Sequence, residues 1–559
     1  MPDLLGLPGQ AVAKVQQYLD RGTAELHYVR KIFEAGGFPL EPPQHLAAMV
    51  NDIRKWGEIG MLPALHARRS PDKVAIIDDD GEMTWKELDD AANAVAHGLL
   101  EKGVKGGDGV AILARNSRWF SVAEFGCARV GARIILLNSS FSGPQIKEVS
   151  EREDAKLIIY DDEYCEDVSK ADPPLGKLRA LGTNPDSDKK SGSKDETLAD
   201  LIGRSSGSPA PKASKHSSII ILTSGTTGTP KGANRSTPPT LAPIGGILSH
   251  VPFKAGEVTA LPAPMFHALG FLHATIGAFL GSTLVLHRKF KPDVVLNDIA
   301  KYRTTAIVVV PVMLSRMLDA LDKMDEKPDL SCLRIVFVSG SALNADVAER
   351  GLKELGPVIY NMYGSTEIAF ATIAEPKHLQ YNPNTAGPVV KGVKVKIFDE
   401  NGKELPQGEV GRIFVGNAFP FEGYTGGGNK QIIDGLLSSG DVGYFDEKGL
   451  LYISGRDDEM IVSGGENVFP AEVEDCLSGH PEVVEATAIG VEDKEWGQRL
   501  RAFVVKKEGS DVDEDTLKKH VRDQLAKYKV PREVIFLDEL PRNPTGKILK
   551  RELREMEVD

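Results

Sequence analysis

Residues 222–232 read LTSGTTGTPKG and directly follow the apolar run Ile219-Ile220-Ile221. The run predicts a buried strand, and a loop of glycine, serine and threonine after it can direct backbone N–H groups and hydroxyls at an anion. Lys231 adds a positive charge to this loop. The stretch therefore favours phosphate binding, with an ordinary turn as the alternative, because loops of this composition also serve as turns.

This stretch is not an ordinary P-loop. That motif ends in Gly-Lys-Ser/Thr, whereas Pro230 separates Gly228 from Lys231 here. The phosphate interpretation thus depends on what the rest of the chain contains.

The bulk composition argues against several classes of protein. The chain has 559 residues, of which 41% are hydrophobic and 26% charged, as is ordinary for a globular protein. Its net charge of −13 argues against nucleic acid as a partner, because non-specific binding needs a basic surface. The four cysteines form no Cys-x-x-Cys pair, which speaks against a zinc site or a disulfide framework and favours a reducing compartment.

The sequence predicts neither a signal peptide nor a membrane-spanning helix. Residues 1–4 lack the basic and apolar regions of a signal peptide, and the longest nearly apolar stretch, residues 306–314, is too short to cross a bilayer. We expect a cytoplasmic protein, and peripheral contact with the inner membrane face stays open.

Residues 1–60 are predicted to form a helical appendage of two short amphipathic helices. Apolar residues fall at helical spacing in two runs: Val12, Val15 and Leu19, and then Leu26, Val29 and Phe33. Gly36-Gly37 ends the second run. Such stripes usually face a core, so packing on the main domain is favoured over docking onto a membrane or a partner.

From residue 74 onward the pattern alternates between predicted strands and helices, which indicates a largely parallel sheet covered by helices. Strands are expected at 74–77, 110–114, 132–137, 156–160, 283–286, 306–310 and 334–338, and helices at 85–100, 121–129, 294–301, 313–321 and 345–355. Segments 183–194 and 204–218 are rich in Ser, Gly, Pro, Asp and Lys and are predicted to be surface loops.

The texture changes after Gly387-Pro388 to short β runs at 393–398 and 412–415, which suggest a small β-barrel. Another mixed piece follows, with strands at 484–490 and 501–505 and a helix at 515–525. We therefore expect an α/β protein in three parts: the appendage at 1–60, a large domain at 61–455 made of two α/β units and a β-barrel near 388–455, and a small α+β domain at 456–559 with a hinge at 456–458.

Five more motifs follow the first one along the chain: YGSTE at 363–367, SGD at 439–441, GRDD at 455–458, SGGEN at 463–467 and PRNPTGK at 541–547. The six motifs in this order resemble those of the adenylate-forming superfamily, which comprises acyl-CoA synthetases, luciferases and peptide-synthetase adenylation domains. The resemblance extends from about Thr84 to Arg551. The long appendage and residues 231–235, KGANR, further resemble bacterial fatty-acid–CoA ligases of the mycobacterial type.

The resemblance implies that ATP activates a carboxylic acid as an acyl-AMP and that pyrophosphate is released. Glu367 matches the carboxylate that holds Mg²⁺, and Thr366 would contact the α-phosphate. The first motif would hold the β- and γ-phosphates through Thr223, Ser224, Gly225, Thr226, Thr227, Gly228 and Lys231.

The nucleoside is assigned to groups that can stack on it or bond to it. Tyr363, followed by Gly364, offers an aromatic face to adenine, Asn361 offers an amide to its edge, and the Ser341-Ala342 backbone can line the same pocket.

The sugar and the α-phosphate are assigned to Asp441 and Arg456. Asp441 can accept hydrogen bonds from both ribose hydroxyls, and Arg456 can donate to the ribose or the α-phosphate. Ser439 stands where the family usually has threonine, so the hydroxyl is retained.

The two half-reactions are assigned to different residues of the C-terminal part. By resemblance, Lys547 neutralises charge at the α-phosphate and the substrate carboxylate while the adenylate forms. Asp458 matches the hinge about which the small domain rotates, and Gly464, Gly465 and Glu466 would then face the thiol of coenzyme A.

The acyl pocket is assigned to His267, Phe271, Val310 and Met362, with His267 positioning the acyl carbonyl rather than acting as an acid or base. Amino-acid-activating relatives carry an aspartate near His267, and residues 263–274 contain no acidic residue, so a fatty or aryl acid is favoured. An acyl-CoA ligase for medium- to long-chain fatty acids is the leading hypothesis. A ligase that loads a carrier protein, an aryl-CoA ligase, a luciferase-like oxygenase and a non-catalytic adenylate-binding protein are the alternatives, and the oligomeric state stays open.

Overall fold

A computed structural model describes residues 9–38, 42–181, 193–223, 231–235, 240–419, 421–425, 427–457, 461–463, 466–493, 497–526, 529–543 and 546–556. Of these, residues 9–21, 223, 234–235, 462–463, 466–467 and 497 are described by their backbone alone. The chain divides into two compact units that interleave along the sequence. Unit 1 comprises Met1–Val309, Asp319–Phe337 and Ala418–Asn429, and unit 2 comprises Val310–Leu318, Val338–Asn417 and Lys430–Asp559.

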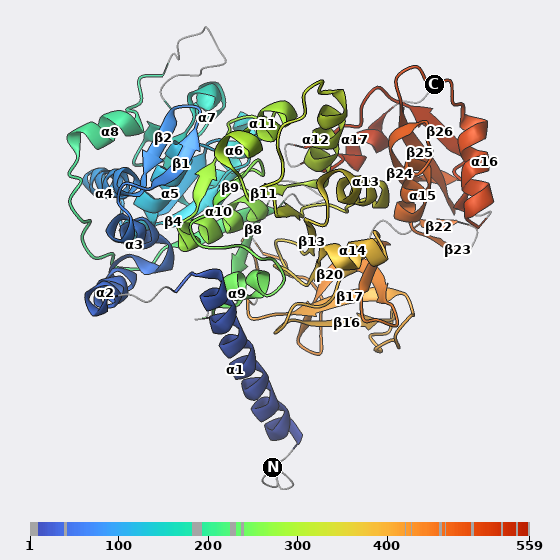
Figure 1. The fold of residues 1–559 in the computed structure, drawn as a ribbon, viewed down its shortest axis with the longest axis horizontal. Helices are drawn as coiled ribbons and strands as arrows, with labels where there is room; N and C mark the ends of the chain where they lie inside the picture. Colours follow the sequence, from blue (N-terminus) through green and yellow to red (C-terminus); the bar gives the residue numbers. More distant parts are fainter. Residues whose placement is uncertain are drawn as a thin grey trace. The chain divides into compact units, whose positions relative to one another are not determined.

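Unit 1 contains a seven-stranded sheet in the order β18-β8-β7-β4-β3-β5-β6, of which Figure 1 labels β4 and β8. Its strands are β3 (Gly109–Leu113), β4 (Arg133–Leu136), β5 (Ala155–Tyr160), β6 (Lys177–Arg179), β7 (Ser218–Thr223), β8 (Lys231–Arg235) and β18 (Phe421–Tyr424). The strands from β7 to β6 pair in parallel, whereas β8 and β18 are added antiparallel. Every residue of β3 is buried, as expected for a parallel strand that is covered on both faces.

A second set of strands in unit 1 pairs in the order β11-β9-β10-β1-β2, parallel except for the β1–β2 hairpin. These strands are β1 (Val74–Asp78), β2 (Gly81–Thr84), β9 (Val258–Ala260), β10 (Thr283–Val285) and β11 (Ala306–Val309). The helices of unit 1 are α1 (Gly9–Ala35), α2 (Pro43–Gly60), α3 (Leu62–Arg69), α4 (Trp85–Glu101), α5 (Arg118–Val130), α6 (Gly143–Arg152), η1 (Asp162–Tyr164), α7 (Cys165–Val168), α8 (Leu198–Arg204), α9 (Ala242–Leu248), α10 (Ala268–Leu280) and α11 (Pro292–Tyr302). Two elements contribute residues to both units, α12 (Pro311–Lys323) and β12 (Ile335–Val338).

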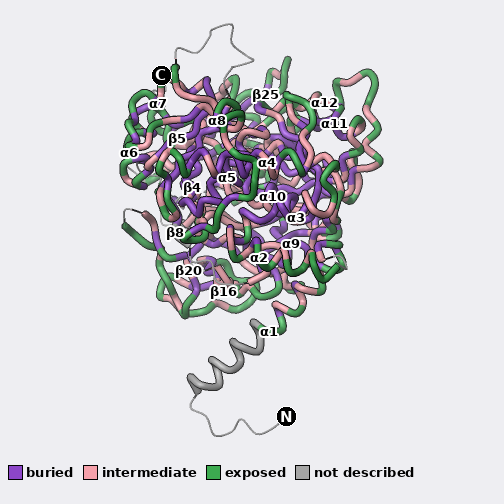
Figure 2. The backbone as a smooth tube through the Cα atoms, turned by 90° about the vertical axis from the view of Figure 1, so that its left-hand side faces the viewer, coloured by how far each residue is buried: buried purple, intermediate pink, exposed green. Residues whose placement is uncertain are grey.

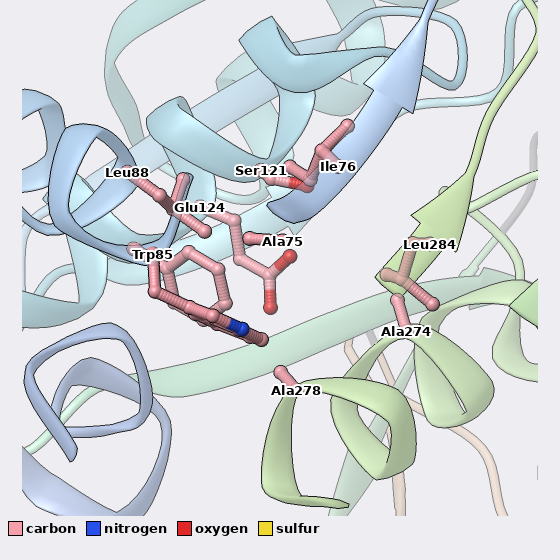
Figure 3. A pocket seen from close by; sticks show the side chains of 10 residues that line it. Ala75, Ile76, Trp85, Leu88, Ser121, Glu124, Ala274, Ala278 and Leu284 are labelled. Atoms are coloured by element: carbon pink, nitrogen blue, oxygen red, sulfur yellow. The ribbon is translucent and has the colours of Figure 1, made fainter. Parts of the chain in front are cut away.

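Helix α5 lies in the interior of unit 1, where Figure 2 shows it in the colour of buried residues. One of its side chains, Glu124, is only 2% exposed and lines a cavity of about 10 Å³ whose other lining is mostly apolar (Figure 3). The indole of Trp85 faces the same cavity, and its Nε1 has no hydrogen-bond partner among the described residues. Burial raises the pKa of the Glu124 carboxyl to about 8, so this side chain is largely protonated at neutral pH.

The N-terminal segment differs from its prediction in two respects. The two apolar runs belong to a single helix of 27 residues, α1, because the lone Gly22 between them costs only about 1 kcal/mol relative to alanine. In the second run, whose side chains are described, the predicted stripe is not the buried face, since Leu26 is 73% exposed and Phe33 is 55% exposed. The buried side chains come from the adjacent face, where Ala24 and Tyr28 pack against Ala242 of α9.

The second predicted surface loop, 204–218, is partly buried. Ala210 is only 2% exposed, its backbone N–H donates to the Asn93 side chain at 3.0 Å, and its carbonyl accepts from Trp56 Nε1 at 3.2 Å. These bonds fasten the segment to α2 and α4, which a polar composition alone does not reveal. Most of the first predicted loop, 183–192, lies outside the described residues.

Unit 2 contains a six-stranded antiparallel sheet in the order β15-β21-β20-β17-β16, with β19 also paired to β20. Its strands are β15 (Thr385–Gly387), β16 (Lys394–Phe398), β17 (Gly411–Gly416), β19 (Ile432–Ile433), β20 (Leu436–Phe445) and β21 (Leu451–Arg456). Strands β13 (Ile359–Tyr363) and β14 (Thr372–Ala374) pair antiparallel, and α13 (Ala345–Leu355) and α14 (Pro376–Tyr381) complete this part.

The C-terminal part of unit 2 contains a five-stranded sheet in the order β23-β22-β25-β24, with β26 paired to β25. Its elements are β22 (Ile461–Ser463), β23 (Glu466–Val468), α15 (Pro470–Ser478), β24 (Val483–Asp493), β25 (Gly497–Lys506), α16 (Glu514–Gln524), β26 (Glu533–Phe536) and α17 (Lys550–Glu555). Across the described part of the chain, no helix combines the length and the apolarity that a membrane span requires.

Candidate active site

The predicted motif 363–367 forms a tight turn after β13. A Cβ atom built on Gly364 would lie 2.1 Å from the carbonyl oxygen of Ala369, so only glycine fits this position. Ser365 Oγ donates to Glu367 Oε2 at 2.9 Å and accepts from the Glu367 backbone N–H at 3.3 Å. The turn therefore holds the half-buried Thr366 and Glu367 next to the end of a strand.

Asp441 connects this turn to the six-stranded sheet. Tyr363 Oη donates to Asp441 Oδ2 at 2.6 Å, and Arg456 Nη1 donates to Oδ1 at 3.2 Å from the facing position on β21. Burial raises the pKa of Asp441, an effect that Arg456, Tyr363 and Lys430 oppose. Burial also raises the pKa of Tyr363 well above its ordinary value, so its hydroxyl remains a donor.

Ser439 fixes the backbone that carries Asp441. Its hydroxyl donates to the Ile413 carbonyl at 3.0 Å and accepts from the Asp441 N–H at 3.0 Å. The hydroxyl at this position thus has a structural role within β20.

One charged residue of this cluster was missed by the sequence analysis. Lys430 Nζ donates to the carbonyl oxygen of Ser439 at 2.9 Å, beside Asp441. Lys430 belongs to none of the sequence motifs. Its position beside Asp441 is seen only in the fold, which brings its side chain to β20.

The assigned residues at the ends of β12 and β13 are also neighbours within unit 2. Ser339 Oγ donates to the Met362 carbonyl at 2.8 Å, which joins the segment leading to the exposed Ser341 and Ala342 with the strand that carries Asn361. Met362 itself is buried.

The loop of Lys547 is closed by its own hydrogen bonds. Asn543 N donates to the Lys547 carbonyl at 2.9 Å, and Lys547 N donates to Asn543 Oδ1 at 2.9 Å. A Cβ atom built on Gly546 would lie 2.4 Å from Val312 and 3.4 Å from Val310, so the backbone here lies against the start of α12. The exposed Lys547 and the buried Val310 are therefore brought into the same region of unit 2.

The first motif lies in unit 1. Thr223 and Lys231 are register partners on β7 and β8, so the two ends of the loop are adjacent, and a strand follows the loop where a P-loop has a helix. Lys231 Nζ donates to the Gly427 carbonyl at 3.4 Å and lies 5.9 Å from the centre of the Tyr424 ring. The predicted ligands Ser224, Gly225, Thr226, Thr227 and Gly228 lie outside the described residues.

His267 and Phe271 are also in unit 1, at the start of α10. Burial lowers the pKa of His267 to about 4, so the ring is neutral at pH 7, and its Nε2 has no hydrogen-bond partner among the described residues. Phe271 is 9% exposed, and its N–H donates to the His267 carbonyl at 2.8 Å. A neutral, buried imidazole suits substrate positioning better than proton transfer.

The predicted hinge and thiol-facing residues are covered only in part. Asp458, Gly464 and Gly465 lie outside the described residues, and Glu466 is described as the register partner of Ser463 in the β22–β23 hairpin.

The donors of this site are those that a nucleotide-bound Mg²⁺ ion requires. No cluster of three or more His, Cys, Asp or Glu residues that could hold a metal occurs in the described part of the chain. Nucleotide-bound Mg²⁺ uses one or two carboxylates together with phosphates and water, and the single carboxylate of Glu367 fits that pattern. The ion would offset negative charge on the phosphates.

Comparison with known proteins gives consistent matches. Residues 64–425 match the family model described as AMP-binding enzyme, and residues 472–547 match the one described as AMP-binding enzyme C-terminal domain. A fatty acid–[acyl-carrier-protein] ligase of Streptomyces coeruleorubidus is 32% identical over 509 residues, which cover 88% of this chain and 95% of that protein. A feruloyl-CoA synthase of Amycolatopsis sp. is 32% identical over 507 residues, which cover 89% of this chain and 98% of that protein.

Solved structures agree with the fold. The o-succinylbenzoate CoA synthetase of Bacillus subtilis, in complex with its acyl-adenylate intermediate, superimposes with a TM-score of 0.75 and 26% identity over 89% of this chain and 98% of that chain. The predicted fold class, α/β with a small α+β C-terminal part, is thereby confirmed.

Proposed function

Because the chain belongs to the AMP-binding enzyme family, we propose that it is an ATP-dependent acid–thiol ligase that forms an acyl-AMP and transfers the acyl group to coenzyme A. The observation that carries the proposal is the cluster at Asp441. A mostly enclosed carboxylate bonded to both Tyr363 and Arg456 provides two acceptor oxygens next to an aromatic ring and a guanidinium, as a ribose with its base and α-phosphate requires.

In the first half-reaction an oxygen of the substrate carboxylate attacks the α-phosphorus of ATP, and the bond between this phosphorus and the pyrophosphate oxygen breaks. Asp441 holds the ribose hydroxyls, Tyr363 stacks on adenine with Asn361 at the base edge, and Thr366 contacts the α-phosphate. Lys231 and the loop before it orient the departing pyrophosphate. Lys547 offsets the negative charge that builds up as the nucleophile approaches.

In the second half-reaction the sulfur of coenzyme A attacks the acyl carbonyl carbon, and the bond to the AMP oxygen breaks, so AMP leaves and a thioester forms. The thiol must give up its proton in this step. Rotation about Asp458 would withdraw Lys547 and present the segment at Gly464, Gly465 and Glu466.

We further propose a medium- to long-chain fatty acid as the acyl substrate. Support comes from the apolar, buried side chains of Phe271, Val310 and Met362, and from the neutral His267, none of which offers a charge to an amino group. A fatty acid–carrier-protein ligase and a feruloyl-CoA synthase among the relatives make a carrier-loading ligase and an aryl-CoA ligase the competing candidates.

A panel of alkyl and aryl acids, scored for AMP release with and without coenzyme A, separates these candidates. We expect AMP release to be strongest with fatty acids and to depend on coenzyme A for multiple turnovers. Release that ignores coenzyme A would favour carrier loading, and a preference for hydroxycinnamic acids would favour the aryl ligase. If no acid supports AMP release, the proposed function is wrong.

The division into residues 1–60, 61–455 and 456–559 is likewise proposed for the functional domains. Limited proteolysis should cut first near 456–458 if this segment is the hinge, and acyl-AMP should change the rate of that cut. A rate that is insensitive to acyl-AMP would contradict the hinge assignment.

A further inference from the structure

Lys430 is a charged residue to which the proposed function assigns no role. It lies just before β19 and reaches the part of β20 that precedes Asp441, where its Nζ donates to the Ser439 carbonyl at 2.9 Å. A Cβ atom built on Gly440 would lie 3.1 Å from Lys430 Nζ and 3.3 Å from Arg456 Nη2. Two cations thus lie against the same glycine, directly before Asp441 in the chain.

The carboxylate of Asp441 needs this positive charge. Its side chain is only 12% exposed, and burial favours the neutral, protonated form. The titratable and charged groups that face it are Tyr363 from β13, Arg456 from β21 and Lys430 from the segment before β19.

Arg456 alone does not form a tight ion pair with Asp441. The Nη1–Oδ1 distance of 3.2 Å is longer than the roughly 2.7–2.9 Å of a strong charge-assisted hydrogen bond, and the Arg456 side chain is 35% exposed. Tyr363 contributes a hydrogen bond without a positive charge. A second cation therefore makes a difference to the ionisation of Asp441.

We propose that Lys430 is a positioning residue of the nucleotide site, which keeps Asp441 ionised and the adjoining backbone of β20 in place so that both carboxylate oxygens accept the ribose hydroxyls. This inference rests on the proposed function, because it assumes that a ribose binds at Asp441. A protonated Asp441 would offer a donor where the ribose also offers one, and nucleotide affinity would fall.

The test measures binding of AMP to the full-length protein by titration calorimetry at pH 6, 7 and 8. The variants are Lys430→Met, which removes the charge, and Lys430→Arg, which keeps it. Lys403→Met serves as a matched control, since Lys403 is exposed in a turn of the same sheet. The quantity compared is the Kd of each variant divided by that of the wild type at the same pH, which cancels the titration of AMP itself.

For Lys430→Met we expect this ratio to be higher at pH 6 than at pH 8. A shift of the acid limb toward neutral pH by about one pH unit allows a rise of at most about tenfold. Lys430→Arg and Lys403→Met should stay within about twofold of the wild type at every pH, a margin small against the tenfold effect of one pH unit. A Lys430→Met ratio that is independent of pH would show a merely structural role and overturn the inference, as would a failure of Lys430→Arg to restore the profile. If the folded wild type binds no AMP at any pH, the proposed function itself fails, and this inference fails with it.

Discussion

Replacing Glu124 with glutamine should remove a pH-dependent penalty on the stability of unit 1. Glu124 lies on the buried helix α5 and lines a small, mostly apolar cavity (Figure 3). Burial raises its pKa from 4.5 to about 8. Between these two pH values the folded state holds a proton that the unfolded state has released, so the free energy of unfolding falls as the pH rises.

The magnitude follows from the difference between the two pKa values. One pKa unit corresponds to about 1.36 kcal/mol, so the interval from 4.5 to about 8 amounts to about 5 kcal/mol once the pH exceeds the upper value. The stabilising contribution of the neutral form is complete below pH 4.5 and is lost as the pH rises through 8. Glutamine has nearly the same shape and no charge, so the variant should match the wild type near pH 5 and exceed it by up to about 5 kcal/mol at pH 8.5.

Urea unfolding at several pH values between 5 and 8.5, followed by tryptophan fluorescence, measures this difference. Glu58→Gln is the control, because Glu58 is exposed on α2. The comparison of each variant with the wild type at the same pH removes the contribution of all other titrating groups. If the Glu124→Gln and wild-type curves run parallel from pH 5 to 8.5, the carboxyl does not ionise with the raised pKa, and the reasoning is refuted.

Three further substitutions test the site and the core. Lys547→Ala should slow acyl-AMP formation by about 100- to 1,000-fold while thioester formation from supplied acyl-AMP is retained, and an equal loss of both half-reactions would contradict the role of Lys547. Gly364→Ala places a methyl group 2.1 Å from the Ala369 carbonyl oxygen. Pyrophosphate exchange should therefore fall by at least about tenfold, which corresponds to roughly 1.4 kcal/mol. Unchanged exchange would show that the turn adapts to the methyl group. Arg129→Met leaves Asp89 without the buried guanidinium that bonds to it. The free energy of unfolding, measured with urea at pH 7, should fall by about 3–5 kcal/mol. A fall below about 1 kcal/mol would mean that the ion pair contributes little to stability.

Much of the secondary structure was predictable because its signals are local. The apolar run at 219–221 lies within β7, and the helix predicted at 345–355 coincides with α13. Asp441 and Tyr363 were each assigned to the site from their motifs. Their mutual hydrogen bond was not predicted, because it depends on how β13 meets the six-stranded sheet, which no local pattern specifies.

The parts that could not be predicted depend on neighbours far along the chain. Helical periodicity predicted that the stripe with Leu26 and Phe33 is buried, but the face with Ala24 and Tyr28 is buried instead, because Ala242 packs against it. Lys430 lies outside every motif. The sequence around Glu124 also does not show that its side chain is buried, because a single glutamate in a helix is usually exposed. Burial of a charged group is a property of the fold and becomes visible only in three dimensions.

Unit 1 is complete only after the short segment Ala418–Asn429 has been synthesised. Its strand β18 pairs with β8, with Phe421 opposite Arg235, although almost two hundred residues lie between them. A nascent chain that has emerged only as far as β11 therefore carries β8 as an open edge, able to pair with strands of other chains. We expect ribosome-bound intermediates of this protein to need chaperone protection until residue 424 has left the exit tunnel. A truncated protein that ends before residue 418 is expected to aggregate.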